Sequence, residues 1–215
     1  MSPRTDTPLW TQSYLTNLTA TFAFWFNVDF LLLVLPLYMR GNGFDASAIG
    51  LVFGAAAPAA IIARLLSGRL IDRTGGRLFL LCCAAAWAFG SAAMAFTGDL
   101  FVLVTLRLLQ GAGLGVFTNA SLAYVSYSVP PTKRDQALGW WAAATPTMAT
   151  LAPVAAAFIS QRFGFTTAFL VAAAAGVIST LTGLLLPRLE RSTQTVSDAA
   201  PTYPPLSYRG FLGAR

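Results

Sequence analysis

Three ionisable side chains interrupt otherwise apolar stretches of this sequence: Asp29, Arg64 and Arg107. A charge at the centre of a bilayer costs roughly 2.5–3.5 kcal/mol on insertion scales, so each of them needs a structural or functional reason. An acid and an arginine in such a setting could bind a polar or charged small molecule, and the acid could also exchange a proton. Histidine is absent, which removes serine–histidine pairs, histidine metal clusters and imidazole proton relays. We therefore expect no catalytic residue, no metal and no cofactor, and an intramembrane enzyme is disfavoured.

The composition indicates whether this chain folds in water or in a lipid bilayer. Of its 215 residues, 56% are hydrophobic and 10% are charged, and the mean hydropathy is +0.64. Soluble domains carry about 25% charged residues, so a water-soluble globular protein is excluded, and a disordered chain is excluded by the large apolar content. Cys82 and Cys83 are adjacent and too few for a zinc site, and we interpret them as small apolar fillers. The sequence predicts a multi-pass membrane protein.

Six apolar runs are long enough to cross a bilayer core about 30 Å thick as helices. They cover residues 15–38, 46–70, 78–97, 100–129, 136–160 and 165–187, and short segments rich in Gly, Pro and charge separate them. The predicted fold class is therefore an all-α membrane protein with six transmembrane helices. We divide the chain into an N-terminal tail (1–14), a six-span bundle (15–187) and a polar, proline-containing tail (188–215).

The distribution of positive charge predicts the orientation. Ten of the fourteen Lys and Arg residues fall on one side of the predicted membrane and two on the other, with Arg64 and Arg107 inside spans. Because cytoplasmic loops are enriched in Lys and Arg, both termini are expected in the cytoplasm, and we expect the bacterial inner membrane. The cations are spread over four segments, so the net charge of +6 does not indicate nucleic acid as a partner.

A weak internal repeat relates the two halves of the bundle. A shift of 89 residues places Gly50 on Gly139, Arg73 on Arg162 and Gly75 on Gly164. Chance matches are common in an alanine-rich chain. A true repeat of three spans would have opposite topology in its two copies, and this inverted 3+3 pattern is typical of secondary transporters.

The first span places aromatic side chains around its acid. Phe26, Asn27 and Phe30 lie close to Asp29 along the helix, and aromatic rings attract cations. Asp29 is nine residues from the external end of its span, about 14 Å deep, and Arg107 is about 10 Å below the same face. The similar depths allow either an Asp29–Arg107 ion pair or two oppositely charged walls of a cavity. Aromatic packing around one buried acid is the alternative.

The fourth span has one face more polar than the rest, formed by Arg107, Gln110, Gly111, Leu114, Thr118 and Ser121. A polar stripe in lipid must face protein or water. We predict that Arg107 and Gln110 line a cavity, and that Gly111, Gly113 and Gly115 allow close helix packing. Arg64 lies about 9 Å from the cytoplasmic end of its span, so we favour snorkelling or a structural contact over a functional role for it.

Two motifs identify a family resemblance. Residues 68–77 read GRLIDRTGGR and resemble the signature loop of the major facilitator superfamily, G-x-L-x-D-R-x-G-R-R/K, with Gly76 in place of the usual Arg. Residues 107–113 read RLLQGAG and are similar to its second motif, R-x-x-Q-G-x-G. Gly139 and Pro153 match a third, efflux-type pattern in span five, whose other positions differ, so assignment as an antiporter stays open. The resemblance covers residues 15–187, the first of the family's two six-span halves.

The resemblance implies a role for the loop between spans two and three. Gly68, Asp72, Arg73, Gly75 and Arg77 stand at the positions of a gating loop that holds the two halves closed on the cytoplasmic side. Gly139 and Pro153 are expected to serve helix packing. The second half, which carries the partner helix of this loop, is not part of the 215 residues.

These observations predict a secondary transporter, or its N-terminal half, that moves a small molecule by alternating access. Proton-coupled efflux is the favoured mode, with proton and substrate competing for Asp29. The expected partners are a small-molecule substrate, protons, the lipid bilayer and a second six-helix half, supplied as a homodimer or a separate chain. The alternative is a truncated or half-size membrane protein that does not transport without such a subunit.

Overall fold

The computed structural model describes residues 9–74 and 76–187, and the side chains of residues 72–74 are not described. It contains five long helices: α1 (Gln12–Gly41), α2 (Ala46–Thr74), α3 (Gly76–Met94), α4 (Leu100–Ser128) and α5 (Arg134–Leu184). A short 3-10 helix, η1 (Pro131–Lys133), precedes α5, and the described residues include no strand. All five long helices have the length and apolar composition of membrane spans. The expected all-α membrane architecture is confirmed at this level.

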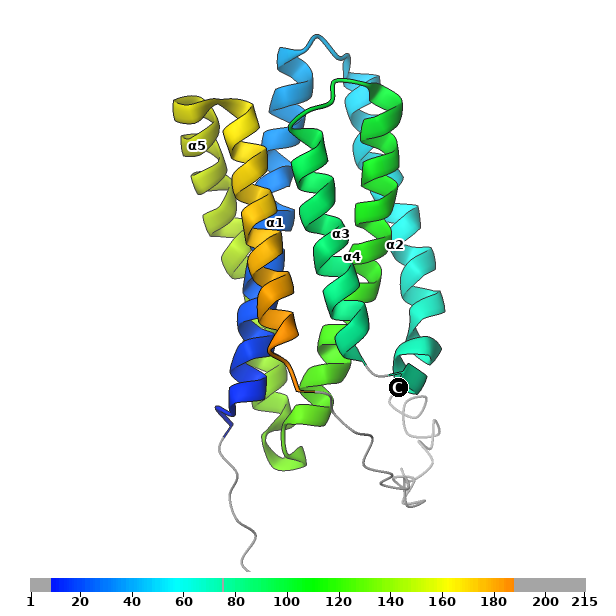
Figure 1. Ribbon diagram of the computed structural model, residues 1–215, viewed down its shortest axis with the longest axis vertical. Helices are drawn as coiled ribbons and strands as arrows, with labels where there is room; N and C mark the ends of the chain where they lie inside the picture. The colour runs from blue at the N-terminus through cyan, green and yellow to red at the C-terminus, as the bar shows by residue number, and fades with distance from the viewer. Residues whose placement is uncertain (1–8, 75, 188–215) are drawn as a thin grey trace, which may run out of the picture.

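The longest helix is two segments joined at one residue. α5 is assigned as 51 residues, but Gly164 within it has φ 84° and ψ 169°, a conformation essentially restricted to glycine. The chain reverses direction there, so residues 134–163 and 165–184 run alongside each other in opposite senses (Figure 1). This position matches the break that the sequence predicts between spans five and six.

Side-chain hydrogen bonds cap the starts of two helices. Thr11 accepts a hydrogen bond from the backbone N–H of Tyr14, and Asp99 accepts one from that of Val102, which satisfies otherwise free donors at the starts of α1 and α4. α1 begins three residues before its expected start. α2 continues to Thr74, through the segment predicted as a polar loop.

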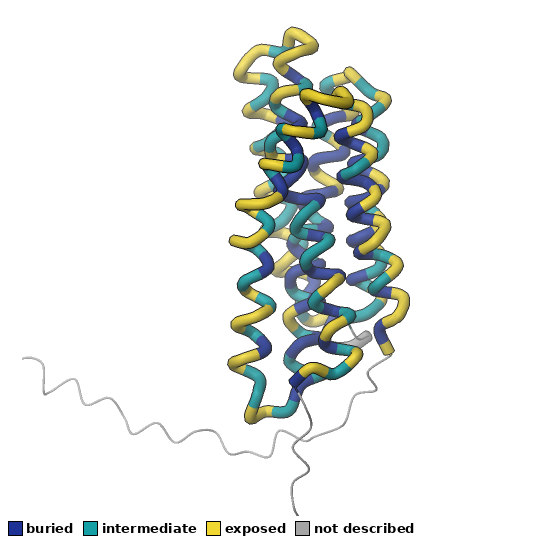
Figure 2. The backbone as a smooth tube through the Cα atoms, turned by 90° about the vertical axis from the view of Figure 1, so that its left-hand side faces the viewer, coloured by how far each residue is buried: buried dark blue, intermediate teal, exposed yellow. Residues whose placement is uncertain are grey.

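The helices pack as an elongated bundle (Figure 1). α1 packs mainly on α5 and α2 on α4, while α3 contacts both α4 and α5. The interior is rich in aromatic contacts: the rings of Phe24 and Phe117 stack with centroids 3.7 Å apart, and Trp87 meets Phe24 edge-on at 5.5 Å. Buried residues concentrate inside the bundle, and exposed ones follow its outer surfaces (Figure 2).

One helix differs from the rest in its exposure. Of the most apolar 18-residue window of α2, 6% is buried, against 39–56% for the other four helices. Leu51, Ile61, Ile62, Leu65 and Leu66 are each more than half exposed on it. α2 therefore has a long apolar surface that the other described helices leave uncovered.

Candidate functional site

Asp29 is a buried acid without a charged partner among the residues that the structure describes. Its side chain is 6% exposed in the middle of α1, and Oδ2 receives no hydrogen bond. Phe30 is fully buried beside it, and Phe26 is half-buried with its ring 5.4 Å from that of Phe30. Asp29 thus lies on the same helix as this aromatic pair, and its Oδ2 has no hydrogen-bond donor among the described residues.

Arg107 is held by neutral groups. It is 3% exposed on α4, and its Nη1 donates to Oε1 of Gln110 at 3.3 Å. Its guanidinium carbon lies 4.5 Å from the ring centroid of Phe53, a cation–π contact from α2. Nε of Arg107 has no hydrogen-bond partner. Within the described residues, no ion pair joins Arg107 to Asp29, so the two charges are buried separately.

Asn27 and Gln110 face the packed interior. The Ser91 hydroxyl of α3 lies 2.8 Å from Asn27 Oδ1, and a Cβ added at Gly176 of α5 would lie 2.6 Å from Asn27 Nδ2. A Cβ at Gly90 of α3 would lie 2.9 Å from Gln110 Nε2. Both amide nitrogens lack hydrogen-bond partners. Asp29 Oδ2 and Arg107 Nε are likewise buried without a hydrogen-bond partner among the described residues.

The glycines of α4 lie at its closest contacts. A Cβ at Gly111 or Gly115 would overlap the carbonyl oxygen of Ala56 or Ala60 on α2, and a Cβ at Gly113 would lie 3.1 Å from the Trp87 ring. Gly139 differs, because it is exposed and a Cβ added to it would meet no atom within 4 Å. Pro153, also in α5, is half-buried within a helix that continues through it.

The signature loop is described only in part. Arg77 donates from Nη2 to the carbonyl oxygen of Leu184 at 2.7 Å, which joins the start of α3 to the end of α5. Such a bond satisfies one of the free carbonyls at a helix C-terminus. Gly68 lies on α2 with open space at its Cβ position. The side chains of Asp72 and Arg73, and Gly75 as a whole, lie outside the described residues.

A hydroxyl hub connects three helices near the end of the bundle where the described chain begins. Ser121 of α4 accepts a hydrogen bond from Trp141 Nε1 at 2.8 Å, lies 2.9 Å from the Thr21 hydroxyl and donates to Asn17 Oδ1 at 3.3 Å. Ser121 appears on the polar face of span four in the sequence. The partners of Ser121 come from other spans. The same is true of Phe53, which contacts Arg107, and of Ser91, which contacts Asn27. No spacing within one helix could identify these contacts.

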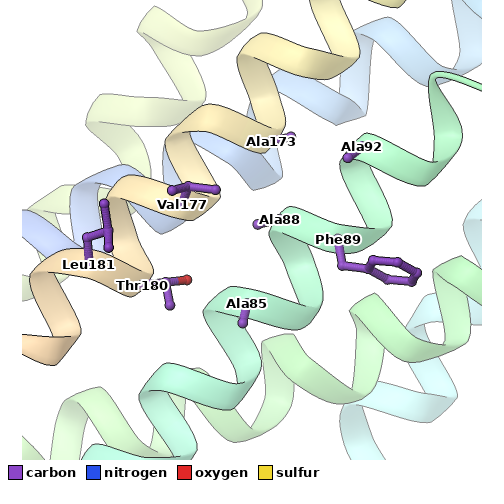
Figure 3. Close-up of a pocket in the computed structure, with 8 residues that line it drawn as sticks. All are labelled: Ala85, Ala88, Phe89, Ala92, Ala173, Val177, Thr180 and Leu181. Carbon is purple, nitrogen blue, oxygen red and sulfur yellow. The ribbon is translucent and has the colours of Figure 1, made fainter.

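Among the hollows on the described surface are two that are lined by neither Asp29 nor Arg107. One, of about 340 Å³, lies between α3 and the second segment of α5 and is lined mainly by alanine, leucine, valine and phenylalanine (Figure 3). The other, of about 440 Å³, lies between α2 and α4 next to Gly68, Asn119 and Arg134.

The long apolar helices and buried intramembrane charges define a polytopic membrane protein. The sequence profile of the Major Facilitator Superfamily matches residues 18–212, so the chain belongs to this family. The family consists of transporters rather than enzymes, which agrees with the expectation from the sequence.

The relatives that this chain resembles are mostly drug-resistance exporters. It is 32% identical over 193 residues to the multidrug resistance protein MdtG of Klebsiella pneumoniae, covering 85% of this chain and 46% of that protein. It is 26% identical over 182 residues to a multi-drug resistance efflux pump PmrA homolog of Lactococcus lactis, covering 83% and 45%. The tetracenomycin C resistance and export protein of Streptomyces glaucescens is 26% identical over 125 residues, covering 58% and 23%. The chain spans less than half the length of these relatives.

Proposed function

We propose that this chain forms one six-helix half of a secondary transporter that exports a small molecule in exchange for protons. The observation that carries the proposal is Asp29, a buried carboxyl group whose Oδ2 has no hydrogen-bond donor, in a chain that belongs to a transporter family. The resistance proteins among its relatives favour efflux as the direction. Protons and substrate would bind at Asp29 in turn, with Arg107 and Gln110 as further polar groups for the substrate.

An inverted repeat of three plus three helices is part of the proposal. The break at Gly164, which divides α5 into two segments, supports a sixth span. Exchange of spans one, two and three with four, five and six would map the α2–α4 pair onto the pair of α1 with the first segment of α5. α2 packs extensively on α4, and α1 packs extensively on α5 as a whole. A hydrogen bond joins α1 to the first segment of α5, since the Tyr14 hydroxyl donates to the carbonyl oxygen of Ala137 at 2.9 Å.

The membrane orientation follows from the same proposal. The start of α1 and the end of α5 lie at the same end of the bundle (Figure 1), consistent with an even number of crossings. The excess of Lys and Arg on that side supports a cytoplasmic location of both ends, in a bacterial inner membrane.

A second six-helix bundle is needed for alternating access, because one bundle cannot rock against itself. The uncovered surface of α2 and the relatives' twofold greater length both support this requirement. Without such a bundle the 215-residue chain would not transport. The alternative function is therefore a membrane protein that needs a second six-helix subunit. Substrate-driven proton movement in proteoliposomes, measured together with crosslinking of the same sample, tests the proposal. Transport by a strictly monomeric species would contradict the need for a second bundle.

A further inference from the structure

The hollow of about 340 Å³ between α3 and the second segment of α5 opens on the side of the bundle. Ala88 and Ala92 of α3 face Val177 and Thr180 of α5 across it (Figure 3). Most of the α3 side chains that line it are alanine, and their small size leaves the space that larger side chains would fill. None of the lining residues belongs to α2, so the hollow is separate from the uncovered surface of that helix.

The lining offers almost no polar group to a ligand. Its one hydroxyl, on Thr180, donates to the carbonyl oxygen of Gly176 in its own helix at 2.9 Å. Every other lining residue is apolar, and Phe89 and Leu181 are 64% and 55% exposed beside the hollow. A polar ligand would leave its own hydrogen bonds unmade there, which is costly. In a bilayer, the occupant that fits this lining is a hydrocarbon chain.

Arg77 lies beyond one end of this hollow, where α3 begins and α5 ends. Thr180 lines the hollow, and Leu184 is four residues further along α5, about 6 Å. Nη2 of Arg77 donates to the carbonyl oxygen of Leu184, so the guanidinium group lies about one helical turn from the hollow. On an ideal helix, Arg77 is also within about 60° of Ala88 and Ala92. A cation and an apolar hollow therefore share one face of α3.

The described residues leave the charge of Arg77 without a counterion. Its Nε is buried without a hydrogen-bond partner, and no described carboxylate pairs with the guanidinium group. Its acceptor, the carbonyl of Leu184, is neutral. The end of α5 contributes about half a negative charge and the start of α3 about half a positive one, so the two helix dipoles offset each other. A phosphate group matches the remaining donors, because it accepts two parallel hydrogen bonds from a guanidinium and neutralises its charge.

We propose that α3 and the second segment of α5 bind an anionic phospholipid, with its phosphate at Arg77 and one acyl chain in the hollow. A phospholipid joins these two groups over the short distance that separates the guanidinium from the hollow. An anionic headgroup is favoured over a zwitterionic one, because the latter carries its own cation and leaves the charge of Arg77 uncompensated. Basic pockets between transmembrane helices bind anionic headgroups in this way. The inference does not depend on the proposed transport function.

The test uses the full chain in phosphatidylcholine vesicles that contain a trace of phosphatidylglycerol with a photoactivatable diazirine in its acyl chain. After illumination, the crosslinked residues are mapped by peptide mass spectrometry. We expect the crosslinks to concentrate on residues 85–92 of α3 and 173–181 of α5. A phosphatidylcholine probe with the same acyl chain should give about fivefold fewer crosslinks there, the preference expected from one arginine near the membrane surface. Equal yields with the two probes, or crosslinks spread evenly over all exposed apolar helices, would overturn the proposal using the unaltered chain alone.

Two pairs of variants locate the two ends of the lipid. Arg77→Gln removes the charge but keeps an N–H donor, and it should abolish the preference for phosphatidylglycerol, while Arg69→Gln, which alters an exposed arginine of α2, should retain it. Ala85→Leu narrows the hollow and should reduce the crosslinks there, whereas Ala174→Leu, at an exposed alanine of α5 that does not line the hollow, should not.

Three results from these samples would contradict the proposal. Retention of the preference in Arg77→Gln would show that the headgroup lies elsewhere, and unchanged crosslinks in Ala85→Leu would show the same of the acyl chain. Displacement of the lipid probe by inorganic phosphate would assign Arg77 to a soluble anion. Failure of inorganic phosphate to compete, together with competition by unlabelled phosphatidylglycerol, is the result that we expect.

Discussion

Gly111→Ala is the substitution for which the structure makes the sharpest prediction. The added Cβ would overlap the carbonyl oxygen of Ala56 and lie 2.8 Å from that residue's carbonyl carbon and Cα. These are backbone atoms, so no side-chain rotation relieves the contact and α2 must move away from α4. A gap of about 0.5–1 Å forfeits a quarter to a half of the dispersion energy of the atoms involved. Overpacking of this kind costs about 1–3 kcal/mol.

The expected result is a lower unfolding temperature. For a chain of this size, that cost corresponds to a decrease in Tm of about 2–12 °C. Thermal unfolding in detergent, followed by tryptophan fluorescence, measures it. Gly139→Ala is the matched control, because nothing lies within 4 Å of its added Cβ and alanine is favoured over glycine in helices by about 1 kcal/mol. A Gly111→Ala protein at least as stable as Gly139→Ala would refute the α2–α4 packing described above.

Two further substitutions test other parts of the bundle. Ser121→Ala removes the acceptor of the Trp141 indole and should destabilise the fold by about 1–2 kcal/mol, measured by thermal unfolding against Ser126→Ala, whose hydroxyl bonds within its own helix. An unchanged Tm would mean that the hub does not join the helices. Gly164→Ala forces a side chain into a glycine-only conformation and should cost about 1–3 kcal/mol in the same assay. Tolerance of alanine there would contradict the reversal between the segments of α5.

The membrane architecture is largely predictable because it depends on local properties. Hydrophobic length and Gly or Pro breaks locate the spans, so the predicted boundaries fall close to the observed helices and the break at Gly164 coincides with the reversal in α5. The prediction of a polar loop around Asp72 is wrong in detail, since helix α2 continues to Thr74. Charge and polarity alone do not distinguish a loop from a helix end that reaches water.

The candidate site is only partly predictable, because neighbours from other helices decide what each polar residue does. The spacing within span four places Arg107 and Gln110 on one helix face as predicted cavity-lining residues, and in the structure a hydrogen bond joins them. The sequence does not reveal that Phe53 of α2 covers Arg107, or that glycines of α3 and α5 enclose Gln110 and Asn27. Arg64 is the clearest case, since its exposure on an uncovered helix is a property of the packed bundle.

Exchange of Asp29 for Asn tests the transport proposal most directly. Inside-out membrane vesicles from the native host, with the chromosomal gene carrying Asp29→Asn, would be compared with unaltered vesicles and with Asp45→Asn, an exposed acid outside the long helices. The readout is uptake of an exported fluorescent dye such as ethidium after a proton gradient is imposed. We predict normal amounts of the Asp29→Asn protein in the membrane, loss of gradient-driven uptake, and unchanged uptake with Asp45→Asn. Gradient-driven uptake at the unaltered rate by the Asp29→Asn vesicles would contradict the proposal that Asp29 carries the proton.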